Sequence, residues 1–188
     1  MKKSILLAGI VGAAALCSCA DDADSLYLNA QARFTFNYAN AVPILYTALN
    51  SPGQFCFASC KINSQGYISS YHFENSRSQT DYPATQILSK TYYTSFGGQG
   101  FIIGVTSIPD LSTQQQQLVA FDRICPTCYE ETYITRTLEF SSETVVKCNR
   151  GHVYDLNNLG QPMDSTTHHT LYRYPIFYNG SNLVNISH

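Results

Sequence analysis

The chain has few charged residues and no cluster of basic ones. Asp, Glu, Lys and Arg together make up 13% of the 188 residues, and the formal net charge is −2. A protein that binds nucleic acid needs lysines and arginines gathered on one face to neutralise phosphates. The sequence contains no such gathering, so we expect no nucleic-acid partner.

Long apolar runs and catalytic signature motifs are also missing. The apolar run at residues 5–16 is about a dozen residues long, which is too short to span a bilayer comfortably. The sequence has neither a glycine-rich loop that cradles phosphate nor the serine elbow of hydrolases. We therefore favour a binding or electron-transfer role over an enzymatic one.

The N-terminus has the order of an export signal. Lys2 and Lys3 precede the apolar run, which ends in Leu16-Cys17-Ser18-Cys19. This ending resembles the lipobox of bacterial lipoproteins, and the resemblance implies cleavage before Cys19 and attachment of lipid to its sulfur. An ordinary secretory signal with an incidental Cys19 is the alternative. We expect residues 1–18 to be a lipoprotein signal peptide and the lipid on Cys19 to hold the protein at a membrane.

Residues 19–28 have the composition of an acidic tether, with Asp21, Asp22 and Asp24 close together. An acidic run at this position resembles the export signal that sends some lipoproteins to the outer cell surface, and a solvated tether is the other interpretation. Loss of Lys2 and Lys3 with the signal peptide changes the net charge from −2 to about −4. The prediction is an outer-membrane lipoprotein, either facing the periplasm or at the cell surface.

Residues 29–188 are expected to form a single β domain. Tyrosine is abundant, at 14 residues, and aromatic and β-branched side chains suit pleated surfaces. Pro43 near the start of residues 42–49 indicates a short helix in the N-terminal half. Short strands separated by turns favour a mainly β fold, an antiparallel sandwich or small barrel. The strands are expected at residues 30–38, 55–62, 66–73, 101–106, 118–123, 133–140, 144–148, 153–156, 171–178 and 183–187, and the state of residues 85–96 stays open.

Two short segments carry side chains that bind soft metals. Cys125 and Cys128 have C-x2-C spacing, and about 19 residues later Cys148 and His152 have C-x3-H spacing. The pattern is close to zinc-ribbon spacing, with one extra residue in the second pair. Thiolate and imidazole hold zinc, iron and iron–sulfur clusters. The sequence therefore predicts a metal site made of Cys125, Cys128, Cys148 and His152.

The residues around these ligands resemble the Rieske domain. Residues 119–123 before Cys125 look like the strand that enters its first cluster loop. Cys148, Gly151 and residues 154–156, followed by Gly160, look like the second loop and its exit. Residues 171–176 and the turn before residues 183–186 look like the closing hairpin. The resemblance covers about the last 90 residues, with the ligand loops at about 118–165. It implies an antiparallel β fold, a [2Fe–2S] cluster and electron transfer.

The ligand set departs from that family. A Rieske cluster is bound by two cysteines and two histidines. Thr127 stands where the first histidine belongs, Gly151 stands where the second belongs, and His152 comes one place later. Only Cys125 and Cys148 match.

Three interpretations of the site stay open. It holds one Zn or Fe ion, or a cluster with altered ligands, or it is vestigial, with a disulfide and no metal. With one ion or a vestigial tip, the protein is expected to be a binding or structural module, and with an altered cluster it is expected to transfer electrons. A surface module that binds a glycan or a protein is a further alternative.

The other cysteines and histidines have simpler interpretations. In an extended segment, Cys56 and Cys60 lie about 13 Å apart on one face, which is too far for a disulfide. We expect them to be packed thiols. His72 is expected within a strand, and His168 and His169 in a surface loop.

Overall fold

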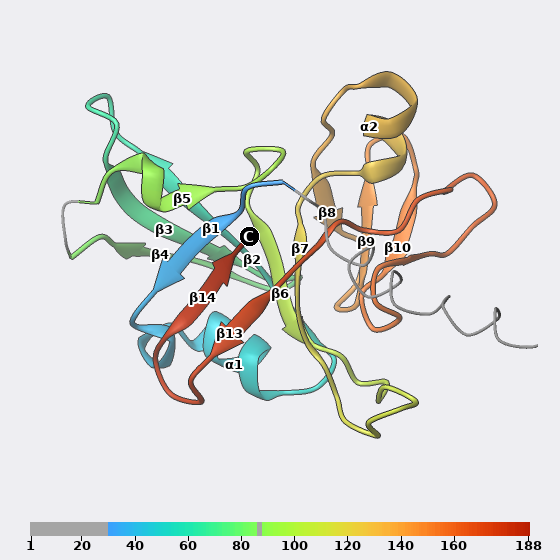
Figure 1. Cartoon of the computed structure of the whole chain (residues 1–188), viewed down its shortest axis with the longest axis horizontal. Coiled ribbons are helices and arrows are strands. Elements are labelled where there is room, and N and C mark those ends of the chain that lie inside the picture. Colours follow the sequence, from blue (N-terminus) through green and yellow to red (C-terminus); the bar gives the residue numbers. More distant parts are fainter. Residues whose placement is uncertain (1–29, 86–87) are drawn as a thin grey trace, which may run out of the picture.

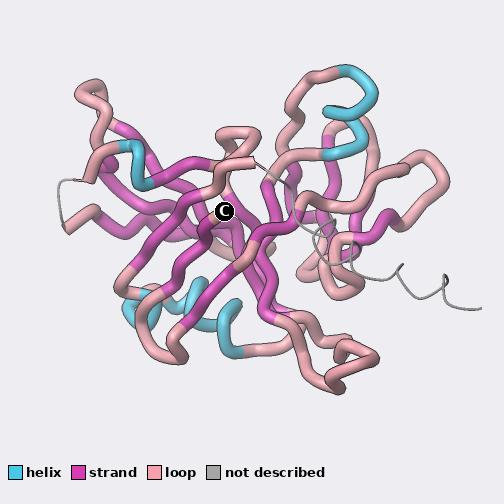
Figure 2. The backbone as a smooth tube through the Cα atoms, viewed as in Figure 1, coloured by secondary structure: helices cyan, strands magenta, loops and turns pink. Residues whose placement is uncertain are grey.

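The computed structural model describes residues 30–85 and 88–188 and shows a mainly β protein with three antiparallel sheets (Figure 1). This confirms the fold class expected from the sequence. Strands and loops make up most of the backbone, and the helices are short (Figure 2). No helix of the described part is long and apolar enough to cross a membrane. The signal peptide at 1–18, the tether at 19–28 and Cys19 lie outside the described residues.

A six-stranded sheet forms the centre of the molecule. Its central strand β2 is apolar at four consecutive positions, as expected for a strand that is buried on both faces. Cys56 and Ala58 pack into one hydrophobic core, while Phe55 and Phe57 pack into a second core on the opposite face. In spatial order the strands are β12 (Arg173–Tyr174), β7 (Leu118–Asp122), β6 (Phe101–Val105), β2 (Gln54–Ile62), β3 (Ile68–Glu74) and β4 (Gln79–Pro83).

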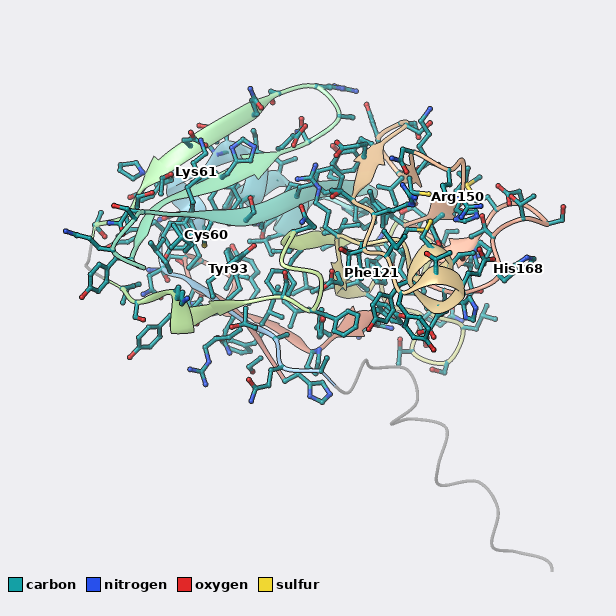
Figure 3. The ribbon with its side chains drawn as sticks, turned by 90° about the horizontal axis from the view of Figure 1, so that it is seen from above. Cys60, Lys61, Tyr93, Phe121, Arg150 and His168 are labelled. Atoms are coloured by element: carbon teal, nitrogen blue, oxygen red, sulfur yellow. The ribbon has the colours of Figure 1, made fainter. Side chains whose placement is uncertain are left out.

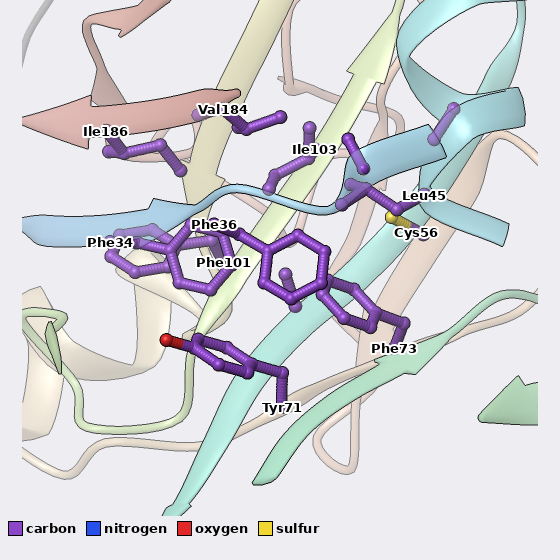
Figure 4. Packing of buried hydrophobic residues seen from close by; sticks show 14 of the residues in the cluster. Phe34, Phe36, Leu45, Cys56, Tyr71, Phe73, Phe101, Ile103, Val184 and Ile186 are labelled. Carbon is purple, nitrogen blue, oxygen red and sulfur yellow. The ribbon is translucent and has the colours of Figure 1, made fainter. Parts of the chain in front are cut away.

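The first core lies between the central sheet and a four-stranded sheet. Phe34 and Phe36 of β1 pack against Tyr71 and Phe73 of the central sheet (Figure 4). The helix α1 (Pro43–Asn50) adds Leu45 to the same core. The four strands of this sheet, in spatial order, are β13 (Ile176–Tyr178), β14 (Val184–Ser187), β1 (Arg33–Phe36) and β5 (Tyr93–Thr94). Two short 3-10 helices, η2 (Ala39–Ala41) and η3 (Lys90–Tyr92), lie in the connecting segments.

The second core lies between the central sheet and a smaller sheet at one end of the long axis (Figure 1). Phe57 stacks on Phe140 of this sheet, with ring centroids 4.0 Å apart. Cys125, Cys128 and Cys148 belong to this core. The small sheet consists of β11 (Gln161–Pro162), β10 (Val153–Asp155), β9 (Val145–Cys148) and β8 (Leu138–Phe140), and the helix α2 (Pro126–Thr132) precedes it.

Several predicted elements differ from the structure. Residues 133–140 do not form one strand. The segment begins at Tyr133, the left-handed C-cap of α2, and only Leu138–Phe140 pairs with β9. The strand expected at 171–178 is divided into β12 and β13 on either side of Pro175, whose missing N–H interrupts a ladder. The edge strand β4 and the short strand β11 were not predicted. The helix in the N-terminal half is confirmed as α1.

Candidate metal centre

The first ligand segment follows β7 and begins a helix. The Cys125 N–H donates to the Arg136 carbonyl at 2.8 Å, which fixes the backbone just before α2. Pro126 occupies the first helical position, where its missing N–H costs nothing. The Cys125 sulfur accepts a hydrogen bond from the Cys128 N–H at 3.4 Å and so caps the helix. The turn expected between the two cysteines is therefore the first turn of α2.

The second ligand segment is the turn between β9 and β10. The Cys148 N–H donates to the His152 carbonyl at 3.1 Å, and the Gly151 N–H donates to the Cys148 carbonyl at 3.0 Å. Gly151 has a φ of 92°, a backbone conformation that L side chains rarely adopt. The turn places Cys148 and His152 opposite one another, so the C-x3-H spacing brings both side chains to one point.

The structure brings the four predicted ligands together. All four are buried, with His152 the most exposed at 6%. The His152 Nδ1 atom lies 3.3 Å from the Cys125 sulfur and 3.3 Å from the Cys128 sulfur. The sulfurs of Cys128 and Cys148 are 3.8 Å apart. The four ligand atoms all lie within 4.8 Å of one another, so this Cys3His group is compact enough to hold a metal ion.

The distances match those expected around one ion. A tetrahedral zinc ion with Zn–S bonds of about 2.3 Å places its sulfurs about 3.8 Å apart, and Zn–N bonds of about 2.0–2.1 Å give sulfur–nitrogen separations of about 3.5 Å. The Cys128–Cys148 separation is 3.8 Å, and both separations from His152 are 3.3 Å. These three separations fit a single ion, and since all four atoms lie within 4.8 Å of one another, the other pairs would close by at most about 1 Å around it.

A buried tyrosine joins the two ligand segments. The Tyr154 hydroxyl lies 3.1 Å from the Cys125 sulfur, and it donates to the Thr127 Oγ1 at 3.0 Å. It also accepts from the Thr127 N–H at 3.3 Å. The hydroxyl has one proton, so if Cys125 is a thiolate, which can only accept, donation to its sulfur replaces donation to Thr127. Tyr154 thus links β10 to the first turn of α2 beside the ligand atoms.

Thr127 acts as a hydrogen-bond centre rather than a metal ligand. Its Oγ1 accepts from the backbone N–H groups of His168 and His169 at 3.2 and 3.3 Å. The side chain is completely buried. In the position where a Rieske domain has a histidine, this chain therefore has a residue that attaches the 164–170 loop to α2.

The thiols differ in how readily they ionise. Burial raises the pKa of Cys125 and of Cys128 above the usual value for a thiol. Burial acts in the same direction on Cys148, but hydrogen bonds from the Arg150 and His152 backbone amides, with smaller effects from the other two thiols, lower its pKa. Cys148 is therefore the ligand that loses its proton first, and a bound cation would favour ionisation of the other two.

The remaining candidate residues lie elsewhere. Cys56 and Cys60 are both on β2 and pack with the first core, and burial raises the pKa of both thiols. None of the five described cysteines forms a disulfide. His72 lies within β3, as predicted, and its Nδ1 contacts the Asp81 carboxylate at 2.6 Å. The His168 ring is labelled at the edge of the tip in Figure 3, and no ion-ligand group of the described residues includes it.

Sequence reasoning missed two contributors to this site. It included Tyr154 only as part of a motif and treated Thr127 only as a lost ligand. The sequence did contain a signal for the capping role of Cys125, because a proline directly after a side chain that accepts hydrogen bonds is typical of a helix start.

No protein-family model, no curated protein and no solved structure matches the chain.

Proposed function

We propose that this protein is a lipid-anchored extracytoplasmic module whose Cys/His tip holds one metal ion as a structural centre. The observation that carries the proposal is the gathering of four buried ligand atoms within 4.8 Å of one another. Four protein ligands complete a tetrahedral shell and leave no position for a water molecule or substrate. The ion therefore stabilises the contact between α2 and the β9–β10 hairpin, and it does not catalyse a reaction.

Zinc is the ion that this ligand set supports best. Cys3His is one of the donor sets of structural zinc sites, and zinc accepts thiolate and imidazole in a tetrahedron. A single iron ion binds in the same geometry, with colour as its signature. Raised thiol pKa values at Cys125 and Cys128 do not oppose either ion, because coordination replaces the proton on sulfur.

A two-iron cluster is less well supported by the geometry. In a [2Fe–2S] centre, bridging sulfides separate the irons, so the two ligand pairs stand at opposite ends of the cluster. Here the His152 Nδ1 is 3.3 Å from two different sulfurs, Cys125 and Cys128. These contacts belong to one coordination sphere. Electron transfer by an altered cluster would require the loops to separate.

The resemblance to a Rieske domain is part of the proposal. It is supported by two ligand segments that follow β7 and β9 and meet at the tip of a small antiparallel sheet. We infer a Rieske-like domain in which Cys128 and His152 replace the two histidine ligands, and in which one ion replaces the cluster. The first histidine position is occupied by Thr127, which stabilises the loop through hydrogen bonds instead.

Metal analysis of the mature chain, purified without oxygen, tests this proposal. We expect one zinc per chain and no absorption in the visible range, or one iron with visible bands from thiolate ligation. Two irons with acid-labile sulfide would contradict the single-ion centre. The absence of metal, together with a disulfide between two of the three thiols, would contradict it in favour of a vestigial site.

The anchor is tested separately through Cys19. The Cys19→Ala variant should leave the membrane fraction, because no acyl chain can be attached to alanine. Mass spectrometry of the wild-type N-terminal peptide should show the added lipid. Unchanged membrane fractionation of the variant would contradict the anchor without affecting the metal site.

A further inference from the structure

A cavity of about 250 Å³ is lined by residues of β1, β3, β4 and η3. In Figure 1 these strands lie at the end of the molecule opposite the small sheet that carries the metal site. Its size is close to the lower end of the range of small-molecule sites, roughly 300–1,000 Å³. Most of its wall is aromatic or otherwise apolar. The lining residues that the argument uses are Phe36, Asn37, Tyr38, Tyr71, Tyr82 and Tyr92.

The aromatic rings of this cavity are held in fixed positions. Tyr38 stacks on Tyr82, with centroids 5.5 Å apart, and Phe36 packs edge-on against Tyr82 and Tyr71. In Figure 4 the Tyr71 hydroxyl points away from Phe73, toward the side of the cluster where Phe34 lies. Tyr92 is 51% exposed and stands at the rim. The rings therefore offer a preformed apolar surface at little entropic cost.

The cavity also offers neutral polar groups. Within residues 30–85 and 88–188, no hydrogen bond engages the side chain of Asn37 or the hydroxyls of Tyr71, Tyr82 and Tyr92. Burial raises the pKa of Tyr71 to about 12, so its hydroxyl stays protonated and able to donate. Unpaired donors and acceptors in a partly dry cavity gain the most from a ligand that pairs with them.

A second hollow lies beside the first and shares two lining residues with it. It has a volume of about 420 Å³, and Ala84 and Thr85 line both spaces. Asn63, Gln65, Tyr67 and Ser69 make its wall polar. Of the described residues that line the two hollows, none is Asp, Glu, Lys, Arg or His. The two spaces together form an elongated site with an aromatic end and an open polar end, and both ends are neutral.

We propose that this elongated site binds a neutral oligosaccharide. A sugar ring has an apolar C–H face that packs on tyrosine rings and hydroxyls around its edge that pair with neutral donors and acceptors. The two adjacent hollows fit successive sugar units, with one in the aromatic cavity and the next over Tyr67 and Asn63. An acidic or basic ligand would lose its hydration without gaining a countercharge. The site is independent of the metal centre at the opposite end.

Binding of neutral tetrasaccharides to the mature chain tests the proposal. Calorimetry and tyrosine fluorescence would be recorded with maltotetraose, cellotetraose, tetra-N-acetylchitotetraose and mannotetraose, and with tetragalacturonate as the charged comparison. We expect at least one neutral sugar to bind, with amide shifts at residues 35–38, 67–71 and 82–85 in NMR spectra. Tyr92→Ala and Asn37→Ala should each weaken that binding at least tenfold.

A matched control separates the site from a general loss of tyrosine. Tyr46→Ala, at a position on α1 that is 44% exposed, should leave the affinity unchanged because Tyr46 lines neither hollow. Removal of the metal with a chelator should also leave it unchanged. The proposal would be overturned if no neutral sugar binds at millimolar concentration or if tetragalacturonate binds more tightly than every neutral sugar. Binding that survives both variants would overturn it as well.

Discussion

The sulfur of Cys128 lies 3.8 Å from the sulfur of Cys148, although the two residues belong to different elements, α2 and β9. The separation is too long for a disulfide, which requires about 2.05 Å, and matches two ligands of one tetrahedral ion. Both thiols belong to the second core. An ion bound between them therefore connects the helix to the small sheet.

Replacement of Cys128 should release the metal and destabilise the protein. Cys128→Ser leaves three ligands and a buried hydroxyl, so the metal content should fall well below one per chain. The binding free energy of the ion is then lost from the folded state, and the free energy of unfolding should fall by several kcal/mol. Metal analysis and thermal unfolding measure the two effects.

The control for this variant is Cys60→Ser. Cys60 is also largely buried, but it lies on β2, outside the ligand group. We expect this change to cost about 1 kcal/mol and to leave the metal content unaltered. Equal loss of stability in both variants, with metal retained in each, would show that the four ligands do not act together.

The turn between Cys148 and His152 should be sensitive to the loss of glycine. At Gly151 an added Cβ meets no atom within 4 Å, so Gly151→Ala strains only the backbone, whose φ is 92°. This strain costs about 1–2 kcal/mol. Relaxation of the turn would move His152 away from Cys148, so we expect weaker metal binding in a competition assay with a chelator.

Gly180 provides a matched comparison for Gly151. It has a φ of 78° and equally open surroundings, but it lies in the hairpin between β13 and β14. Gly180→Ala should therefore cost a similar amount of stability without any change in metal affinity. A metal affinity that is equal in the two variants would mean that the geometry of the β9–β10 turn does not determine the position of His152.

The sequence was sufficient to predict the fold class and the four Cys and His side chains that the structure brings together. The C-x2-C and C-x3-H spacings each place two side chains at one end of a short segment, which is a local property. Short apolar stretches bounded by turn residues likewise identified β2, β3 and β6. These features depend on near neighbours in the chain, so they can be inferred without knowledge of tertiary contacts.

Other features depend on distant contacts and could not be predicted. The strand β4 has no apolar alternation and exists because its backbone pairs with β3 at the sheet edge. The role of Thr127 depends on the 164–170 loop, about 40 residues further along the chain. The identity of the two sheets that cover the faces of β2 follows from the three-sheet arrangement, which its local sequence does not specify.

Removal of the Tyr154 hydroxyl should destabilise the tip without releasing the metal. Tyr154→Phe leaves the Thr127 N–H and the Cys125 sulfur without their shared partner in a buried site. We expect a loss of about 1–3 kcal/mol and full metal content, because tyrosine is not a ligand. Tyr129→Phe on α2, whose ring packs edge-on against Phe96, is the control and should change stability little. Loss of metal in Tyr154→Phe would instead give the hydroxyl a direct role in holding the ion.

Asp122 should make stability depend on pH in the direction opposite to that of a typical carboxylate. The side chain is completely buried at the end of β7, three residues before Cys125. Its Oδ2 accepts from the Tyr174 hydroxyl at 3.0 Å, and its Oδ1 has no hydrogen-bond partner in the described part of the chain. Burial raises the pKa of Asp122 to about 6, although the Tyr174 hydroxyl acts to lower it.

The direction in which stability changes with pH depends on whether the folded or the unfolded protein binds the Asp122 proton more tightly. The pKa of Asp122 is about 6 in the folded protein and 3.8 for the unperturbed group, so the folded state binds the proton more strongly. This contribution to stability is fully present below pH 3.8 and is lost as the pH rises through about 6. Between pH 4 and pH 7, wild type should therefore lose about 2–3 kcal/mol relative to Asp122→Asn, which does not titrate.

Comparison of the two proteins at each pH also removes the effect of acid on the metal ligands, which both share. Asp110→Asn is the control, because hydrogen bonds from Ser112 and Thr113 lower the pKa of Asp110 to about 2 and its contribution stays constant over this range. Urea unfolding at pH 4, 5, 6 and 7 measures the difference, and a constant gap between wild type and Asp122→Asn would show that Asp122 has an ordinary pKa.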